Sequence, residues 1–185
     1  MSRAFVKEDA AGEGIVVPAR APLPVGVPNL VTASGLRALH DERRDLEAAR
    51  RRAERLDGAA ARARALLPLD EREAALEERL ASARVVPAPA APDDEVVVGS
   101  EVESRRHDGR AFRLRIVGVD EADPSRGRIA FTAPVADALL GRRVGDVVTA
   151  AGTRLTVVAV RFPSDAIDAV DADGAGGASG ATPDR

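Results

Sequence analysis

The stretch that decides the fold lies in the last third of the chain and consists of three short segments in order. The first is DEADP at 120–124, the second is IAFTAPVADALLG at 129–141, and the third is VGDVV at 144–148. In the second segment, Pro134 suits the first turn of a helix and Gly141 suits the position after its end. The segments therefore predict an acidic turn, a strand, a helix of about two turns, and a Gly-Asp turn before another strand.

The sequence on both sides of these segments predicts further strands. Residues 111–116 alternate apolar and charged side chains, as a half-buried strand does. Asp108-Gly109 forms a hairpin turn just before that strand, and Gly152 marks a second turn before a closing strand over 153–161. We therefore expect residues 96–162 to form a small antiparallel sheet domain with one short helix.

Residues 29–86 predict an antiparallel helical hairpin. Thr32 and Ser34 are candidate N-caps, and an apolar stripe at helical spacing follows them. A second helix is expected to open at Asp70, with Glu73 completing a capping box. The chain has two candidate turns, Asp57-Gly58 at the midpoint and the helix-breaking Pro68, and a kinked second arm with the turn at Asp57-Gly58 reconciles them.

The remaining segments predict irregular structure. Residues 1–28 contain four prolines and are expected to be extended or disordered, residues 87–95 form a Pro/Ala linker, and residues 163–185 form a disordered tail without periodicity. The absence of cysteine fits a reducing cytosol, and we expect a cytoplasmic protein because no secretory or membrane segment is evident. The scarcity of aromatic residues argues against a large aromatic-lined ligand pocket.

The three segments, together with residues 96–162 as a whole, resemble the C-terminal domain of the GreA/GreB transcription elongation factors. Residues 1–9, MSRAFVKED, are similar to the N-terminal arm of a GreB-like subgroup. The resemblance implies an α+β fold, in which an N-terminal antiparallel helical hairpin, a coiled coil, precedes a small FKBP-like antiparallel β domain. It also implies a bacterial protein that binds RNA polymerase at the secondary channel, modulates elongation, and is not itself an enzyme.

The resemblance places a polymerase-docking surface on the acidic segment and the short helix. The positions carried over are Asp120, Glu121, Asp123, Pro134, Leu139 and Leu140. This chain departs from the family pattern at Ala133, where the family has serine, and at Asp137, where it has arginine. The alternative interpretation of the acidic segment is a solvated loop between two strands.

The first predicted helix carries an excess of arginine. The proposed nucleic-acid-facing patch consists of Arg50, Arg51, Arg52 and Arg55. Nascent RNA or DNA within the elongation complex would be attracted to it electrostatically and without sequence preference. The alternative is a solvated face whose arginines pair with Glu47 or Glu54 one helical turn away.

The hairpin tip lacks the acidic motif that cleavage-stimulating Gre factors carry, which resembles G-D-x-x-E-N-A-[ED]-Y. Two-metal hydrolysis needs paired carboxylates to hold a second Mg²⁺. The sequence here is LDGAAAR at 56–62, so Asp57 is a weak candidate for a catalytic tip residue and more typical of a turn. We expect no metal site, no cofactor and no small-molecule substrate, and an elongation factor that works without stimulating transcript cleavage.

Two other functions remain open at this point. The FKBP-like fold also hosts peptidyl-prolyl isomerases, although this domain offers only Phe112, Phe131 and Phe162 for an aromatic pocket. The helical hairpin could instead serve as an adaptor for a different protein. Fold class alone does not decide between these functions.

Overall fold

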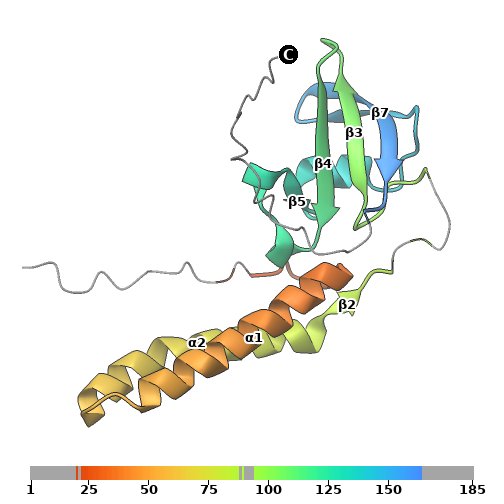
Figure 1. Cartoon of the computed structure of the whole chain (residues 1–185). Coiled ribbons are helices and arrows are strands. Elements are labelled where there is room, and N and C mark those ends of the chain that lie inside the picture. The colour runs from red at the N-terminus through yellow and green to blue at the C-terminus, as the bar shows by residue number, and fades with distance from the viewer. Residues whose placement is uncertain (1–19, 21, 88, 90–93, 164–185) are drawn as a thin grey trace, which may run out of the picture.

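The computed structural model describes residues 20, 22–87, 89 and 94–163, which form a helical hairpin and a separate sheet domain (Figure 1). Residues 1–19 and 21 of the expected arm over 1–28, most of the expected linker, and residues 164–185 of the expected tail over 163–185 lie outside the described residues. Within the described part of the chain, no helix is long and apolar enough to cross a membrane.

The hairpin consists of α1 (Ala33–Glu54) and α2 (Ala59–Ser82). The chain reverses between them at Asp57-Gly58, as expected, and Gly58 has the positive φ of 87° that glycine adopts readily. Thr32 is the N-cap of α1 and accepts a hydrogen bond from the Gly35 N–H, which confirms one of the two expected caps. At about 1.5 Å per residue, the 22 residues of α1 span about 33 Å.

The second helix does not begin at Asp70, so that expectation was wrong. Helix α2 begins at Ala59 and continues through Pro68, which lies inside it. The residues expected to form its capping box instead pair with Arg50 across the hairpin: the Arg50 guanidinium lies 2.5 Å from Asp70 and 2.9 Å from Glu73. Contacts with α1 support α2 from Leu69 onward, just beyond the proline, and tertiary contacts supply most helical stability in proteins.

The hairpin packs tightly near its base and loosely near its tip. Leu39, Leu46 and Leu76 are buried together with Val31 of the short strand β1 (Leu30–Val31). The expected apolar stripe loses its partner beyond Ala53, and Leu56 near the turn is 43% exposed. The sequence pattern therefore overestimated how far the apolar contact between the helices extends.

Two short strands close the base of the hairpin. Strand β1 pairs in parallel with β2 (Arg84–Val85), so the residues before α1 and after α2 lie side by side. The buried Asn29 side chain donates hydrogen bonds to the Arg79 carbonyl at 2.9 Å and to the Ser82 hydroxyl at 3.1 Å. These bonds tie the entering chain to the last turn of α2.

The sheet domain contains five strands in the order β5-β4-β3-β7-β6. The neighbours β4 and β5 run parallel, and the other three pairs are antiparallel. The short helix α3 (Pro134–Leu139) packs against the sheet, and Gly141 follows it with a positive φ. The strands are β3 (Glu101–Arg106), β4 (Ala111–Val117), β5 (Arg128–Ala130), β6 (Val147–Ala150) and β7 (Thr153–Arg161).

The predicted fold class is confirmed: a helical hairpin precedes a small, mostly antiparallel β domain with one short α-helix. The core of the sheet domain is separate from that of the hairpin and includes Val102, Ile116 and Leu139, all fully buried. The two parts meet where β1 and the start of α1 contact the segment after β4. That meeting point contains the acidic segment singled out from the sequence.

The hairpin core generates a stability prediction. Leu76→Ala removes a side chain that is 1% exposed and should lower the free energy of unfolding of the hairpin by about 2–5 kcal/mol, because it leaves a cavity between the helices. Leu67→Ala on the same helix is the matched control, since Leu67 is 63% exposed. Hydrogen exchange of the helical amides measures both. Equal protection in the two variants would contradict the packing described above.

Candidate docking surface and helical hairpin

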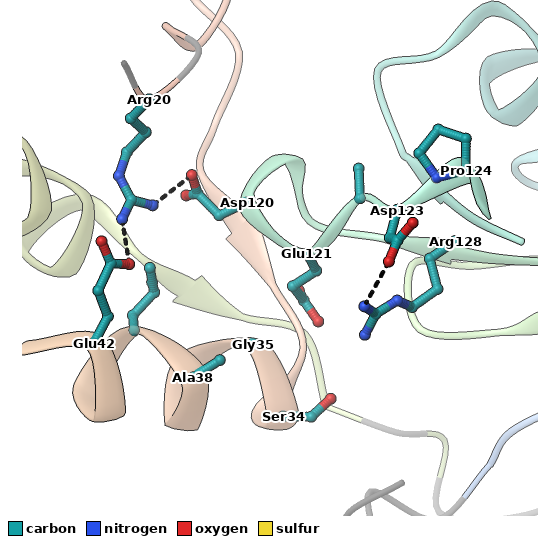
Figure 2. Close-up of a pocket in the computed structure, with 12 residues that line it drawn as sticks. Arg20, Ser34, Gly35, Ala38, Glu42, Asp120, Glu121, Asp123, Pro124 and Arg128 are labelled. Atoms are coloured by element: carbon teal, nitrogen blue, oxygen red, sulfur yellow. Dashed lines mark hydrogen bonds and ion pairs between the residues drawn. The ribbon is translucent and has the colours of Figure 1, made fainter. Parts of the chain in front are cut away.

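The acidic segment folds into two short 3₁₀ turns between β4 and β5. The first, η1, covers Val119–Glu121, and the second, η2, covers Pro124–Arg126. Figure 2 shows that η1 faces the first turn of α1 and that the side chains of Asp120 and Glu121 point toward the hairpin. The acidic segment therefore joins the two parts of the molecule and does not form a freely solvated loop.

The Glu121 carboxylate holds the beginning of the hairpin. It accepts hydrogen bonds from the Thr32 N–H at 2.9 Å, from the Thr32 hydroxyl at 2.5 Å and from the Gly118 N–H at 3.1 Å. Because the Thr32 hydroxyl also accepts from the Gly35 N–H, Glu121 and the N-cap of α1 form one network. A carboxylate near a helix N-terminus is also favoured by the helix dipole.

Two glycines allow this close approach. A Cβ on Gly35 would lie 2.2 Å from Cδ of Glu121, and a Cβ on Gly118 would lie 2.6 Å from the Leu30 carbonyl oxygen. Neither glycine has a positive φ, so the turn geometry does not require glycine there. Their role is to leave room for the neighbouring segment.

Asp120 forms the second link between the domains. Its carboxylate lies 2.6 Å from the Arg20 guanidinium and 3.6 Å from Nε of the buried Arg79, and its side chain is only 9% exposed. Arg20 also pairs with Glu42 of α1 at 2.5 Å. Partial burial lowers the pKa of Arg20, but hydrogen bonds to Glu42 and Asp120 outweigh that effect and raise it above its ordinary value.

A cavity of about 420 Å³ lies between the acidic segment and the first turns of α1. Its lining includes Arg20 and Glu42 on one side and Asp123 and Arg128 on the other (Figure 2). Arg20 pairs with Glu42 on one side, and Arg128 pairs with Asp123 on the other. Asp120 and Glu121 also line the cavity, so its lining carries four acids and two arginines.

Asp123 differs from the two acids before it because its partners lie in the sheet domain and not in the hairpin. Its side chain is 32% exposed and lies 3.7 Å from the Arg128 guanidinium and 3.5 Å from Arg126. The Ser125 hydroxyl and N–H donate to its carboxylate at 2.5 Å and 3.1 Å. The hydrogen bonds from the Ser125 side chain and backbone, followed by the charges of Arg126 and Arg128, hold the pKa of Asp123 below its usual value.

The expected docking residues of α3 and the residue after it also differ in their exposure. Pro134 at the start of the helix is exposed, and Leu140 is half-buried. Leu139 is fully buried in the core of the sheet domain, so it cannot contact a partner directly. Of the six positions, Asp123, Pro134 and Leu140 are accessible, whereas Asp120 and Glu121 are engaged at the domain junction.

The four arginines of the proposed patch on α1 also differ in their exposure and in their ion pairs. Arg50 is taken up by ion pairs with Asp70, Glu73 and Glu54, so it ties the helices together. Arg51 lies 3.9 Å from Glu47 on its own helix. Arg52 and Arg55 are exposed, and these two with Arg51 make up the solvent-facing part of the patch.

Asp57 lies exposed in the turn between the helices, as expected from the sequence. Glu54, at the end of α1, is the nearest acid along the chain, and it lies 3.4 Å from Arg50. Among the described residues, no group of three or more acids, histidines or cysteines is arranged to hold a metal ion.

Sequence reasoning missed the junction between the hairpin and the sheet domain. It assigned Arg20 to an irregular arm and gave Arg79, Gly35 and Gly118 no role. A usable signal was the presence of a glycine in the first turn of a helix and another after a strand, where no turn demands one. Such glycines often mark the close approach of another segment.

The comparisons with known proteins agree with this architecture. A family model described as "Transcription elongation factor, GreA/GreB, C-term" matches residues 91–162. Transcription elongation factor GreA of Desulfovibrio desulfuricans is 43% identical over 75 residues, which are 40% of this chain and 46% of that protein. Residues 91–162 of this chain are thus similar to the C-terminal domain of the GreA/GreB family.

Other GreA/GreB relatives extend the match only slightly. GreA of Acidiphilium cryptum is 36% identical over 99 residues, covering 51% of this chain and 63% of that protein. The chain thus spans about half the length of the curated relatives it matches. The family model matches the sheet domain, which carries the acidic segment and α3.

Two solved structures also resemble the chain. GreA/GreB from Nitrosomonas europaea is 24% identical, with coverage of 74% of this chain and 99% of that one, and a TM-score of 0.36. GreA factor homolog 1 of Thermus thermophilus is 23% identical, with coverage of 73% and 99% and a TM-score of 0.35. Scores this low add nothing to the family assignment.

The junction generates a prediction about domain placement. Gly35→Ala should weaken the contact between hairpin and sheet domain, because the new Cβ would collide with Glu121. Hydrogen exchange at the Thr32 and Gly118 amides, which donate to Glu121, should speed up by about tenfold or more, as expected for the loss of about 1.4 kcal/mol of local stability.

The control is a double variant. Adding Glu121→Ala to Gly35→Ala removes the colliding carboxylate, so the two changes together should cost less than the sum of their separate effects. Strict additivity of the two changes would show that Gly35 and Glu121 do not constrain each other.

Proposed function

We propose that this protein is a transcription elongation factor that binds RNA polymerase at the secondary channel in the bacterial cytoplasm. The observation that carries the proposal is the GreA/GreB match over residues 91–162, with relatives named as elongation factors. The helical hairpin supports it, since α1 projects from the sheet domain for about 33 Å. An element of that shape suits insertion into a narrow channel.

The docking surface we propose is smaller than the sequence suggested. It contains Asp123, which precedes β5 in the chain, and Pro134 and Leu140, which follow it. The surface combines one carboxylate with apolar side chains, as the centre and rim of an interface do. Asp120 and Glu121 set the direction of the hairpin relative to it.

The hairpin contributes electrostatic attraction in this proposal. Arg51, Arg52 and Arg55 face solvent near its outer end, where they would meet the phosphates of nascent RNA or DNA in the elongation complex. Such attraction requires no base contacts, and it weakens as salt rises. Arg50 is excluded from this role because three acids of the hairpin already surround it.

The docking surface is tested by affinity for core RNA polymerase. Asp123→Ala and Pro134→Ala should each weaken binding by at least tenfold, or about 1.4 kcal/mol, because they remove the exposed charge and the exposed apolar contact. Fluorescence anisotropy of the labelled full chain measures the dissociation constants.

Ser125→Ala is the matched control for Asp123→Ala. It removes the hydroxyl that donates to Asp123 and leaves the carboxylate in place, so it separates a disturbed loop from a lost contact. Ser125→Ala should bind within about twofold of the original chain. Unchanged affinity for both Asp123→Ala and Pro134→Ala would rule out this docking surface.

We further propose that the protein occupies the channel without strongly stimulating transcript cleavage, and that it is not an enzyme. A second Mg²⁺ requires at least two well-placed oxygen ligands from the factor, held on a rigid tip. The tip offers Asp57 beside Gly58, and the acid before it, Glu54, lies against Arg50.

RNA shortening in a backtracked elongation complex tests this proposal. The full chain should leave the cleavage rate within about twofold of the polymerase alone, while slowing cleavage by an active Gre factor added in competition. Glu54→Ala and Asp57→Ala serve as a matched pair, and neither should change the result. Rapid cleavage that disappears only with Asp57→Ala would refute the proposal and make Asp57 catalytic.

A further inference from the structure

The end of the β3–β4 hairpin carries a second concentration of arginine, far from the first. Residues 105–110 read Arg-Arg-His-Asp-Gly-Arg, and Arg154 of the neighbouring strand β7 lies beside them, since its carbonyl accepts a hydrogen bond from the His107 N–H at 3.3 Å. Figure 1 shows this end pointing away from the helical hairpin. We call Arg105, Arg106, Arg110 and Arg154 the sheet tip.

The sheet tip carries arginine on both faces of the ribbon. Arg105 aligns with Thr156, so Arg154, two residues along, is its diagonal neighbour on the same face, at about 7–8 Å. Arg106 aligns with Leu155 on the opposite face, and its guanidinium lies 5.6 Å from the centre of the Phe112 ring. An anion in contact with this end would therefore meet cations from two sides.

The sheet tip is not neutralised by the protein. Arg110 lies 3.9 Å from Asp108, but among the described residues no carboxylate lies within 4.0 Å of the guanidinium of Arg105, Arg106 or Arg154. Farther along the same strands, by contrast, Arg113 and Arg161 both contact Glu101 and Glu103. Like charges held close together repel one another, so an external anion that contacts this local excess of cations would be bound favourably.

The backbone beneath the sheet tip is well ordered by hydrogen bonds. The Arg106 N–H donates to the Arg110 carbonyl at 2.8 Å, and the Gly109 N–H donates to the Arg106 carbonyl at 2.9 Å. The Asp108 carboxylate accepts from the Arg110 N–H at 2.9 Å, so the one acid of the turn also fixes its backbone. Placing the arginines on paired strands reduces the entropy lost when a ligand binds.

We propose that the sheet tip binds the phosphate backbone of double-stranded DNA. Its guanidinium groups come from β3, from β7 and from the turn between β3 and β4, and they lie on both faces of this end of the sheet. They can therefore contact phosphates along an edge of the major groove, which is about 12 Å wide. A narrow tip suits an acidic protein less well, because a stable protein interface needs about 800 Å² from each partner. The contact does not depend on polymerase binding.

The test measures binding of the full chain to a labelled 20-base-pair duplex, without polymerase. The triple variant Arg105→Ala/Arg106→Ala/Arg154→Ala should bind at least tenfold more weakly at about 50 mM salt. Its plot of log affinity against log salt should also lose about 2.7 units of slope, since each phosphate contact contributes about 0.9. Arg113→Ala/Arg161→Ala, on the same strands but in acid-paired positions, is the matched control and should change neither quantity appreciably.

Two further measurements distinguish the sheet tip from the patch on α1, and duplex DNA from other polyanions. A helical-hairpin variant, Arg51→Ala/Arg52→Ala/Arg55→Ala, distinguishes the sheet tip from the patch on α1, and thermal unfolding by circular dichroism confirms that every variant is folded. Duplex should bind more tightly than a single strand or polyglutamate of equal length. The proposal is overturned if the sheet-tip variant binds duplex like the original chain, if only the helical-hairpin variant loses affinity, or if polyglutamate binds as tightly as duplex.

Discussion

The contact between the Glu121 carboxylate and the start of α1 is the constraint on which the arrangement of the two domains depends. One side chain from the sheet domain accepts the N–H and the hydroxyl of the N-cap Thr32, so the helix begins at a point defined by the other domain. The approach is possible only because Gly35 and Gly118 carry no side chain. Asp120 adds an ion pair to Arg20 beside this network, and Arg20 in turn holds Glu42 of α1. The acidic segment therefore acts first as a structural connection, and only its last acid is left for a partner.

The arginines of this chain fall into two groups: some pair with acids inside the molecule, and others extend into solvent. Arg20, Arg50 and Arg79 lie where domains or helices meet, and each has acidic partners that offset the cost of partial burial. The arginines near the outer end of the hairpin and those of the sheet tip extend into solvent at opposite ends of the molecule. A net charge of −3 conceals this division, because it counts paired and unpaired arginines alike. The pattern of pairing is thus more informative about binding than the total charge.

The local elements of the fold could be predicted from the sequence, because short-range chemistry determines them. The alternation over residues 111–116 and the turn at Gly152 depend on neighbours in the chain, and both are found as expected. The start of α2 was not predictable in the same way, because packing against α1 carries the helix through Pro68. The roles of Asp120 and Glu121 were missed for a related reason: their partners, Arg20 and Thr32, lie about ninety or more residues earlier in the chain. No periodicity in a single sequence reports such a pair, although the two unexplained glycines indicated that some segment approaches closely.

The length of the hairpin explains why its base is so tightly specified. If the sheet domain docks on a partner, the outer end of α1 is positioned only through the junction, about 33 Å away. A tilt of about 10° at the junction would displace that end by about 6 Å, which exceeds one turn of helix. The loose packing around Leu56 cannot correct such an error, since the outer turns have few buried contacts. The position of the outer end is therefore set at the junction, where Glu121, Gly35 and Gly118 meet. A larger residue at either glycine would therefore displace the far end of the hairpin, even though neither glycine contacts a partner.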